Sequence, residues 1–302
     1  MRIGYWLLLS LFILCHTLSA QGYQQLYQYF EADSTERRGY SSIREQTTQT
    51  TITKKNSLRE IKTVETFYDE SGRLIREERS GNAGIESQLT FGYDSVNGRL
   101  NYILQFSGKI KYEAFAQYDE QGRLSEVVHC PEDKPCQIRH YAYDEDNTER
   151  LYIPRQTIEM QFNKNKPGTL FGFSALNKDK DELVRERFFD PEGKPEEIRQ
   201  YSGGHFSVAW TYEYDPSGRK TKVWINNDKE KMLAAEYVYD NPTGLLQSEK
   251  IYVWVVGTQI LPYRDQGPET TFLTYDSKNR LIKTESDNKN AGKTREYTYF
   301  EY

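Results

Sequence analysis

Carboxylates, histidines and cysteines are the side chains of this sequence that could do chemistry. Carboxylates are abundant, and two that met across a sheet could perform the acid and base steps of glycoside hydrolysis. Only His129, His140 and His205 follow the first 20 residues. The sequence has no Gly-x-Ser-x-Gly, no His-Glu-x-x-His and no glycine loop that could cradle a phosphate. We therefore expect neither enzyme activity nor a cofactor, and a glycoside-active hydrolase is the third-ranked alternative.

Cys130 and Cys136 flank the short stretch PEDKP. With His129 and His140 they make an apparent set of four zinc ligands. Neighbouring residues of an extended strand point to opposite faces, however, so His129 and Cys130 would diverge. Two cysteines in an oxidising compartment favour a disulfide. We therefore predict a Cys130–Cys136 disulfide that staples the end of a hairpin, and no metal site.

The first residues, MRIGYWLLLSLFILCHTLSA, contain one basic residue, an apolar run from Tyr5 to Leu14, and small residues that end at Ala20. This pattern is typical of a secretory signal peptide. The apolar run is about half the roughly 20 residues that a membrane-spanning helix needs. Cys15 follows Leu14, whereas lipoprotein processing needs a small residue there. We therefore expect an exported protein that does not span a membrane and that is periplasmic, at the cell surface or secreted.

The composition favours thin amphipathic sheets over a thick apolar core. Apolar residues make up 36% of the chain, the mean hydropathy is −0.84, and 24 tyrosines dominate the aromatic residues. The net charge is −5, with acidic and basic residues interspersed. Such a charge pattern does not favour nucleic acid or an anionic membrane as a partner.

One seven-residue phrase recurs along the chain, as YDESGRL at Tyr68, YDEQGRL at Tyr118 and YDPSGRK at Tyr214. Its aspartate returns every 25 residues through two runs, and a glycine or asparagine follows each aspartate after three or four residues. The pairs are Asp69 and Gly72, Asp94 and Gly98, Asp119 and Gly122, Asp144 and Asn147, Asp190 and Gly193, Asp215 and Gly218, Asp240 and Gly244, and Asp276 and Asn279.

This pairing predicts a type I turn followed by a bulge, because glycine and asparagine tolerate a left-handed backbone. The aspartate caps the turn, and the loop lacks the carboxylate spacing of a calcium site. A second turn lies midway between copies, and the residues between turns alternate as in LNYILQF and IKYEAFAQY. Such alternation predicts strands, so each unit should be a β-hairpin.

The recurring YDxxGRL hairpins resemble the YD repeats of Rhs proteins, insecticidal toxin shells and teneurins, over residues 61–302. The resemblance implies a β-hairpin array and an adhesive or glycan-binding role. Large members of that family use dozens of repeats to close a hollow shell around a cargo. We expect a short exported member without toxin cargo or a self-cleaving core, so encapsulation is not carried over.

The expected fold class is all-β, an antiparallel meander of about nine or ten β-hairpin YD repeats that forms an extended curved sheet. A β-propeller and a rolled, barrel-like sheet are the alternatives. Residues 1–20 are the expected signal peptide, 21–60 a cap over the first sheet edge, and 61–302 the repeat array. The array has an irregular seam near 151–183 and an insertion near 252–270.

We expect a non-enzymatic interaction module that binds an extracellular or periplasmic glycan or protein on the exposed sheet face. A structural or envelope-assembly component, whose edges or seam meet a partner chain, is the alternative. The step from Asp240 to Asp276 is 36 residues rather than 25, which marks the insertion as an addition. Its aromatic residues Tyr252, Trp254 and Tyr263 are the candidate ligand surface, because a flat ring can stack on a sugar or a partner side chain.

Overall fold

A computed structural model describes residues 26–31, 40–52, 57–132, 136–145, 148–154, 161–162, 170–171, 181–227, 229–256, 259–262, 267–287 and 291–301. One short helix, α2, spans Leu26–Glu31. The strands are β1 Tyr40–Ile52, β2 Ser57–Tyr68, β3 Leu74–Gly81, β4 Gly84–Tyr93, β5 Leu100–Ser107, β6 Ile110–Tyr118, β7 Leu124–Pro131, β8 Gln137–Tyr143, β9 Glu149–Pro154, β10 Gln161–Phe162, β11 Leu170–Phe171, β12 Asp181–Phe189, β13 Pro195–Ser202, β14 His205–Tyr214, β15 Lys220–Asn226, β16 Lys231–Tyr239, β17 Leu246–Ile251, β18 Val253–Val256, β19 Gln259–Pro262, β20 Glu269–Tyr275, β21 Leu281–Ser286 and β22 Ala291–Glu301.

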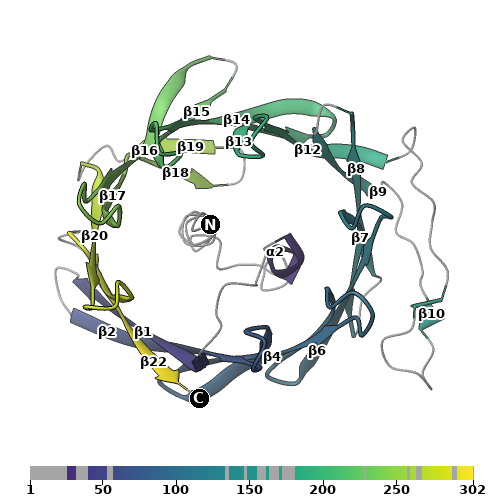
Figure 1. Cartoon of the computed structure of the whole chain (residues 1–302), viewed down its shortest axis with the longest axis horizontal. Coiled ribbons are helices and arrows are strands. Elements are labelled where there is room, and N and C mark those ends of the chain that lie inside the picture. The colour runs from purple at the N-terminus through teal and green to yellow at the C-terminus, as the bar shows by residue number, and fades with distance from the viewer. Residues whose placement is uncertain are drawn as a thin grey trace.

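Eighteen of these strands form one antiparallel sheet that closes on itself as a barrel, seen end-on in Figure 1. β1 pairs with both β2 and β22, and β9 pairs with β12. The prediction of an extended curved sheet is therefore wrong, and the fold is not a propeller of separate blades. The alternative of a rolled, barrel-like sheet fits the structure.

The segment that was expected to cap one sheet edge is what joins the two ends of the sheet. Within residues 21–60, β1 and the start of β2 lie in the barrel wall, and β1 pairs along nearly its whole length on both sides. Antiparallel strands twist relative to their neighbours, so a long sheet curls and brings its edges together. A closed barrel leaves no row of unpaired backbone groups.

Four of the turns at the recurring Tyr-Asp motif, those at Asp69, Asp119, Asp215 and Asp276, use the same hydrogen bonds. In the unit at Asp119, the Gly122 N–H donates to the Asp119 carbonyl at 2.8 Å, and Gly122 has φ 78°. The Asp119 carboxylate accepts the Arg123 N–H at 2.7 Å and the Arg123 Nε–H at 2.8 Å. Burial alone would raise the pKa of Asp119, but these bonds outweigh it and hold that pKa below its ordinary value. The turn therefore consumes the hydrogen-bonding capacity of the aspartate.

In seven of the described units, a tyrosine fastens the unit to the preceding one. Its hydroxyl donates to a backbone carbonyl at the start of the preceding hairpin, over distances of 2.6 to 3.0 Å. The donor and acceptor residues are Tyr93 and Leu74, Tyr118 and Leu100, Tyr143 and Leu124, Tyr214 and Pro195, Tyr239 and Lys220, Tyr275 and Leu246, and Tyr299 and Leu281.

The basic residue of the motif contacts the same tyrosine through its ring face. Arg123, for example, lies 4.4 Å from the centroid of Tyr143, and Arg219 lies 4.8 Å from that of Tyr239. A cation over a ring is attracted by the ring's quadrupole. In each Tyr-Asp-x-x-Gly-Arg motif, the aspartate and glycine thus close the turn, and the arginine contacts the tyrosine of the following unit.

The barrel interior contains two packed clusters on different parts of the wall. α2 lies inside the ring in Figure 1 and packs against the first cluster, on β4 to β9. The second cluster lies on β14 to β17 and includes Val253 of the β18–β19 hairpin, which also lies within the ring. Strand residues on the face that contacts α2 point inward, and the alternating residues point outward.

The irregular seam does not interrupt the sheet, because β9 pairs directly with β12. β10 and β11 pair with each other, and β10 lies outside the ring in Figure 1. The predicted disulfide is confirmed: Cys130 and Cys136 are bonded, with their Cα atoms 4.2 Å apart, between β7 and β8. Within the described ranges, no helix is long and apolar enough to cross a membrane.

The left-handed turn positions provide a test of the turn geometry. Gly193 has φ 81° and open space where a Cβ would lie, so a substitution there tests the backbone alone. Gly193→Val should lower the free energy of unfolding by about 1 to 3 kcal/mol, because a β-branched residue resists this conformation. Gly193→Asn should cost less, since Asn279 already adopts φ 61° at the equivalent turn position. Equal urea midpoints for the two variants would contradict the prediction.

Candidate functional site

α2 presents one apolar face and two polar side chains to the barrel wall. Leu26 and Phe30 are four residues apart, so they share a helix face. They are 1% and 6% exposed, respectively, among the first interior cluster. The Tyr29 ring meets Phe91 edge-on, with centroids 4.9 Å apart. A helix of six residues is too short to be stable alone, so these contacts must hold it.

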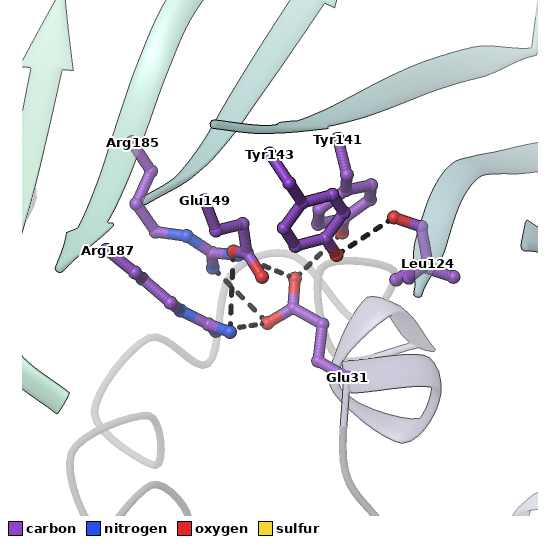
Figure 2. A network of polar contacts seen from close by, with 7 residues as sticks. All are labelled: Glu31, Leu124, Tyr141, Tyr143, Glu149, Arg185 and Arg187. Atoms are coloured by element: carbon purple, nitrogen blue, oxygen red, sulfur yellow. Dashed lines mark hydrogen bonds and ion pairs between the residues drawn. The ribbon is translucent and has the colours of Figure 1, made fainter. Parts of the chain in front are cut away.

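Glu31, the last residue of α2, lies at the centre of a network of charges (Figure 2). Arg187 Nη2 donates to Glu31 Oε2 at 2.6 Å, and Arg185 Nη2 donates to Oε1 at 3.0 Å. The Tyr141 hydroxyl donates to the same Oε1 at 2.8 Å. Glu149 lies against both arginines, 3.0 Å from Arg185 and 3.4 Å from Arg187. Two carboxylates thus share two guanidinium groups and one phenol.

The backbone explains why these side chains converge. Arg185 and Arg187 alternate along β12, so both point inward, and the intervening Glu186 points outward to Arg150. In the pairing of β9 with β12, Leu151 lies opposite Arg185 and Glu149 lies opposite Arg187. The network therefore forms where the two runs of repeats meet.

Electrostatics holds Glu31 and Arg185 in their charged forms and Tyr141 in its donating form. Burial alone would raise the pKa of Glu31, but the charges of Arg185 and Arg187 outweigh it and hold that pKa well below its ordinary value. Burial would lower the pKa of Arg185, but the charges of Glu31 and Glu149 raise it instead. Burial, followed by the charge of Glu31, raises the pKa of Tyr141, which therefore remains a donor.

A second anchor joins α2 to β3. The Tyr29 hydroxyl donates to Glu77 Oε2 at 2.7 Å and accepts Arg79 Nη2 at 3.0 Å. Arg79 Nε also donates to Glu77 Oε1 at 2.6 Å. α2 is thus held by polar contacts to β3 and to the β8–β12 region, with apolar packing between them.

Two groups of opposite charge, the buried Glu249 and the half-buried Lys220, lie in the other part of the interior. Glu249 is 2% exposed, and Lys220 Nζ lies 4.5 Å from the Tyr237 ring centroid. Burial lowers the pKa of Lys220 to about 8, against the opposing effect of Glu249. Burial raises the pKa of Glu249. These groups face aromatic rings of the wall, so they are less suited to hold a ligand than the network around Glu31.

The residues predicted from the sequence do not gather at one place. The repeated aspartates lie in turns, and Asn147 lies outside the described residues. Tyr252 is half-buried: its hydroxyl donates to Glu236, Lys250 lies 5.1 Å from its ring centroid, and its side chain also packs against the second interior cluster. The Trp254 side chain and all of Tyr263 also lie outside the described part of the chain, so this part of the predicted surface stays a prediction.

None of the members of the network around Glu31 carries a sequence motif, so the sequence did not predict the network. Arg185 and Arg187 alternate along one strand, but a bulge between Leu183 and Arg185 places Val184 rather than Leu183 against the first interior cluster, so no regular apolar alternation marks their face. Leu26, Tyr29 and Phe30 have the spacing of one helix face inside a segment that was taken for a polar cap. Their contact joins segments more than 100 residues apart, which no local pattern reveals.

Comparison with known proteins does not identify a family. No family model and no curated protein matches the chain. Among solved structures it is similar to a porin-like protein from Bacteroides uniformis ATCC 8492, at 11% identity and a TM-score of 0.38, covering 87% of this chain and 100% of that one. It is also similar to a DUF1329 family protein from Desulfovibrio piger ATCC 29098, at 8% identity and a TM-score of 0.25, covering 87% and 86%.

A third similar structure is that of TcdB2-TccC3, at 12% identity and a TM-score of 0.21. The match covers 80% of this chain but only 18% of that one. At these identities and TM-scores the likenesses carry no argument about function. The resemblance of the motif to YD repeats stays a prediction.

His129 should make the stability of the barrel depend on pH. It is fully buried inside the wall and stacks on Tyr112 at 5.8 Å. Burial, with a smaller effect of the Arg139 charge, lowers its pKa from 6.5 to about 4. Between these values the unfolded chain binds a proton that the folded chain does not. Stability present above pH 6.5 is therefore lost as the pH falls towards 4, by up to about 3 kcal/mol.

The measurement is the free energy of unfolding in urea at several pH values from 4 to 7. His129→Gln should flatten this part of the curve, because glutamine does not titrate. His205→Gln, at an exposed site at the start of β14, is the matched control and should keep the slope of the unsubstituted protein. Equal slopes for His129→Gln and the unsubstituted protein would refute the prediction.

Proposed function

We propose that the protein is an exported, non-enzymatic binding protein that holds its ligand inside the barrel, where α2 lies. The observation that carries this proposal is that the wall closes without α2. All eighteen strands of the ring pair with strands, whereas α2 enters the interior as an added element. It is held there by side-chain contacts of the kinds that hold a ligand: an apolar face, a phenol and one carboxylate.

The placement of charges supports binding rather than acid and base catalysis. The turn carboxylates are bonded to their own turns and to the following arginine, as at Asp119. Glu31 and Glu149 are paired with the same two arginines. A hydrolase of the glycosidase kind needs two free carboxyl groups on either side of a bond. The inner wall instead offers fixed donors, which suits recognition.

The charged side chains on the outer face of the barrel favour a wall that is surrounded by water. Outward residues form ion pairs such as Arg76 with Glu78 at 3.6 Å and Arg199 with Glu197 at 2.8 Å. Arginine on a lipid-facing strand costs about 2 to 4 kcal/mol at the membrane midplane. The Cys130–Cys136 disulfide is consistent with an oxidising compartment, and a periplasmic, cell-surface or secreted location is part of the proposal.

Glu31→Gln tests whether α2 can leave its site. Removing one partner of a buried ion pair typically costs about 3 to 5 kcal/mol. Glu149 still pairs with both arginines, so we expect the ring to stay folded while α2 detaches. The amides of residues 26–31 should exchange with deuterium roughly 100-fold faster, the ratio expected for about 3 kcal/mol. Hydrogen–deuterium exchange with mass spectrometry measures this.

The control for this variant is Glu78→Gln, which removes an outward ion pair of β3 and should leave α2 protected. Peptides from β5 and β6 report on the wall in the same experiment. If α2 in Glu31→Gln exchanges as slowly as in the unsubstituted protein, α2 is a permanent part of the core and interior binding at its site is wrong.

A second candidate function, glycan binding on the outer face, is favoured by a pair of aromatic residues on either side of β16. Trp224 Nε1 donates to Glu213 at 2.6 Å, and the Tyr252 hydroxyl donates to Glu236. Between them, Glu236 lies opposite Lys222 on one side and Lys250 on the other. Aromatic faces beside carboxylates and amines can stack on a sugar ring and bond to its hydroxyls.

Trp224→Ala tests this outer surface. On a glycan array, the unsubstituted protein should bind a glycan and the variant should lose about fivefold or more in affinity, since an aromatic platform contributes about 1 kcal/mol or more beyond its buried area. Phe272→Ala removes an outward ring that is 53% exposed and should have no effect. Both variants should keep the melting temperature within a few degrees. Equal glycan binding by both variants would exclude this surface.

A further inference from the structure

The wall residues around Glu31 form a carboxylate-binding site that the chain fills with its own side chain. The two guanidinium groups and the Tyr141 hydroxyl donate to both oxygens of a single carboxylate, at 2.6 to 3.0 Å (Figure 2). A guanidinium fork suits the planar pair of oxygens of a carboxylate. Arg185 Nε, moreover, has no acceptor among the described residues, so the site has one donor to spare.

An apolar wall begins directly beside this polar site. Tyr141 pairs with Leu151, which pairs with Arg185, and both Tyr141 and Leu151 belong to the first interior cluster. The same cluster extends across β4 to β7 and covers Leu26 and Phe30 of α2. A ligand that replaced α2 would therefore contact polar donors at one end of the site and a long apolar surface beside them.

The charges favour a ligand with one negative charge. With Glu31 in place, two arginines face two glutamates, so the network is neutral. Without Glu31 it carries one positive charge, and the remaining Glu149 opposes a second negative charge on the ligand. One ionised carboxylate restores neutrality, whereas a doubly charged phosphate group would leave an excess negative charge in a buried place.

We propose that the interior site takes an amphiphilic monocarboxylate, an apolar chain that ends in one carboxylate, as in a fatty acid, and that α2 is its internal competitor. This inference rests on the proposed function. Glu31 holds the position of the ligand carboxylate, and Leu26 and Phe30 hold the position of its apolar chain. The apparent affinity of the ligand is its affinity for the open site multiplied by the fraction of molecules in which α2 has left that site. The affinity is therefore lowest when α2 is firmly bound.

Dodecanoate is the probe, and its binding to the full mature chain is measured by isothermal titration calorimetry. Glu31→Gln should bind dodecanoate at least tenfold more tightly than the unsubstituted protein, because its competitor is weakened. Glu78→Gln should bind like the unsubstituted protein. Dodecanol, which has the same chain length but no charge, should bind to Glu31→Gln at least tenfold more weakly than dodecanoate. Adding Tyr141→Phe to Glu31→Gln should weaken dodecanoate binding several-fold.

A second measurement needs no substitution, in case Glu31→Gln fails to fold. Saturating dodecanoate should speed deuterium exchange of residues 26–31 in the unsubstituted protein, whereas dodecanol at the same concentration should not. If exchange shows that α2 is released in Glu31→Gln but dodecanoate binds no better than dodecanol, the ligand class is wrong and the interior binding function stands. If α2 is released neither by the substitution nor by dodecanoate, both proposals fail.

Discussion

A strand at the edge of a sheet exposes a row of unpaired N–H and C=O groups. β1 lies between β2 and β22 and pairs with both, so neither of these strands is left as an edge. The interior of the barrel, and with it the site around α2, depends on this closure. An open array of the same hairpins would expose both faces of the sheet to water and would have no inside. Once β1 joins the two ends, one face of every strand is enclosed. Alternate side chains along each strand then point into the interior or out to the solvent.

The hairpins were predictable because their signals are local. The left-handed glycine, the capping aspartate and the alternating strand residues all lie within one unit of 25 residues, and the disulfide lies within seven. Closure was not predictable in this way. It depends on the twist summed over many strands and on β1, whose polar, threonine-rich sequence carries no repeat letters. The hydrogen bonds of the repeated tyrosines lie between these cases. The tyrosines recur visibly in the sequence, but the carbonyls that accept their hydroxyl protons lie in the neighbouring unit.

The candidate site was hidden for a related reason. A charged residue on the inward face of a strand usually argues against burial, and Arg185 and Arg187 read as ordinary surface arginines of a polar chain. What makes their burial tolerable is a set of partners from α2 and β9, which satisfy the charge of each guanidinium. Such partners are defined only by the closed fold. The site is therefore a property of the barrel and not of the segment that contains the arginines.

The same pairing decides how α2 could leave. A buried arginine that loses its carboxylate costs several kcal/mol, so spontaneous release of α2 is opposed by the charges it would abandon. Exchange with an incoming carboxylate avoids this cost, because each guanidinium keeps an anionic partner and the network stays neutral. The balance then rests on the apolar contacts. Leu26 and Phe30 present compact side chains to the wall, whereas a long hydrocarbon chain gains about 0.8 kcal/mol for each CH₂ group that it buries. Chain length, rather than charge, should therefore decide which carboxylate displaces α2, with affinity rising as CH₂ groups are added until the wall beside Arg185 is covered.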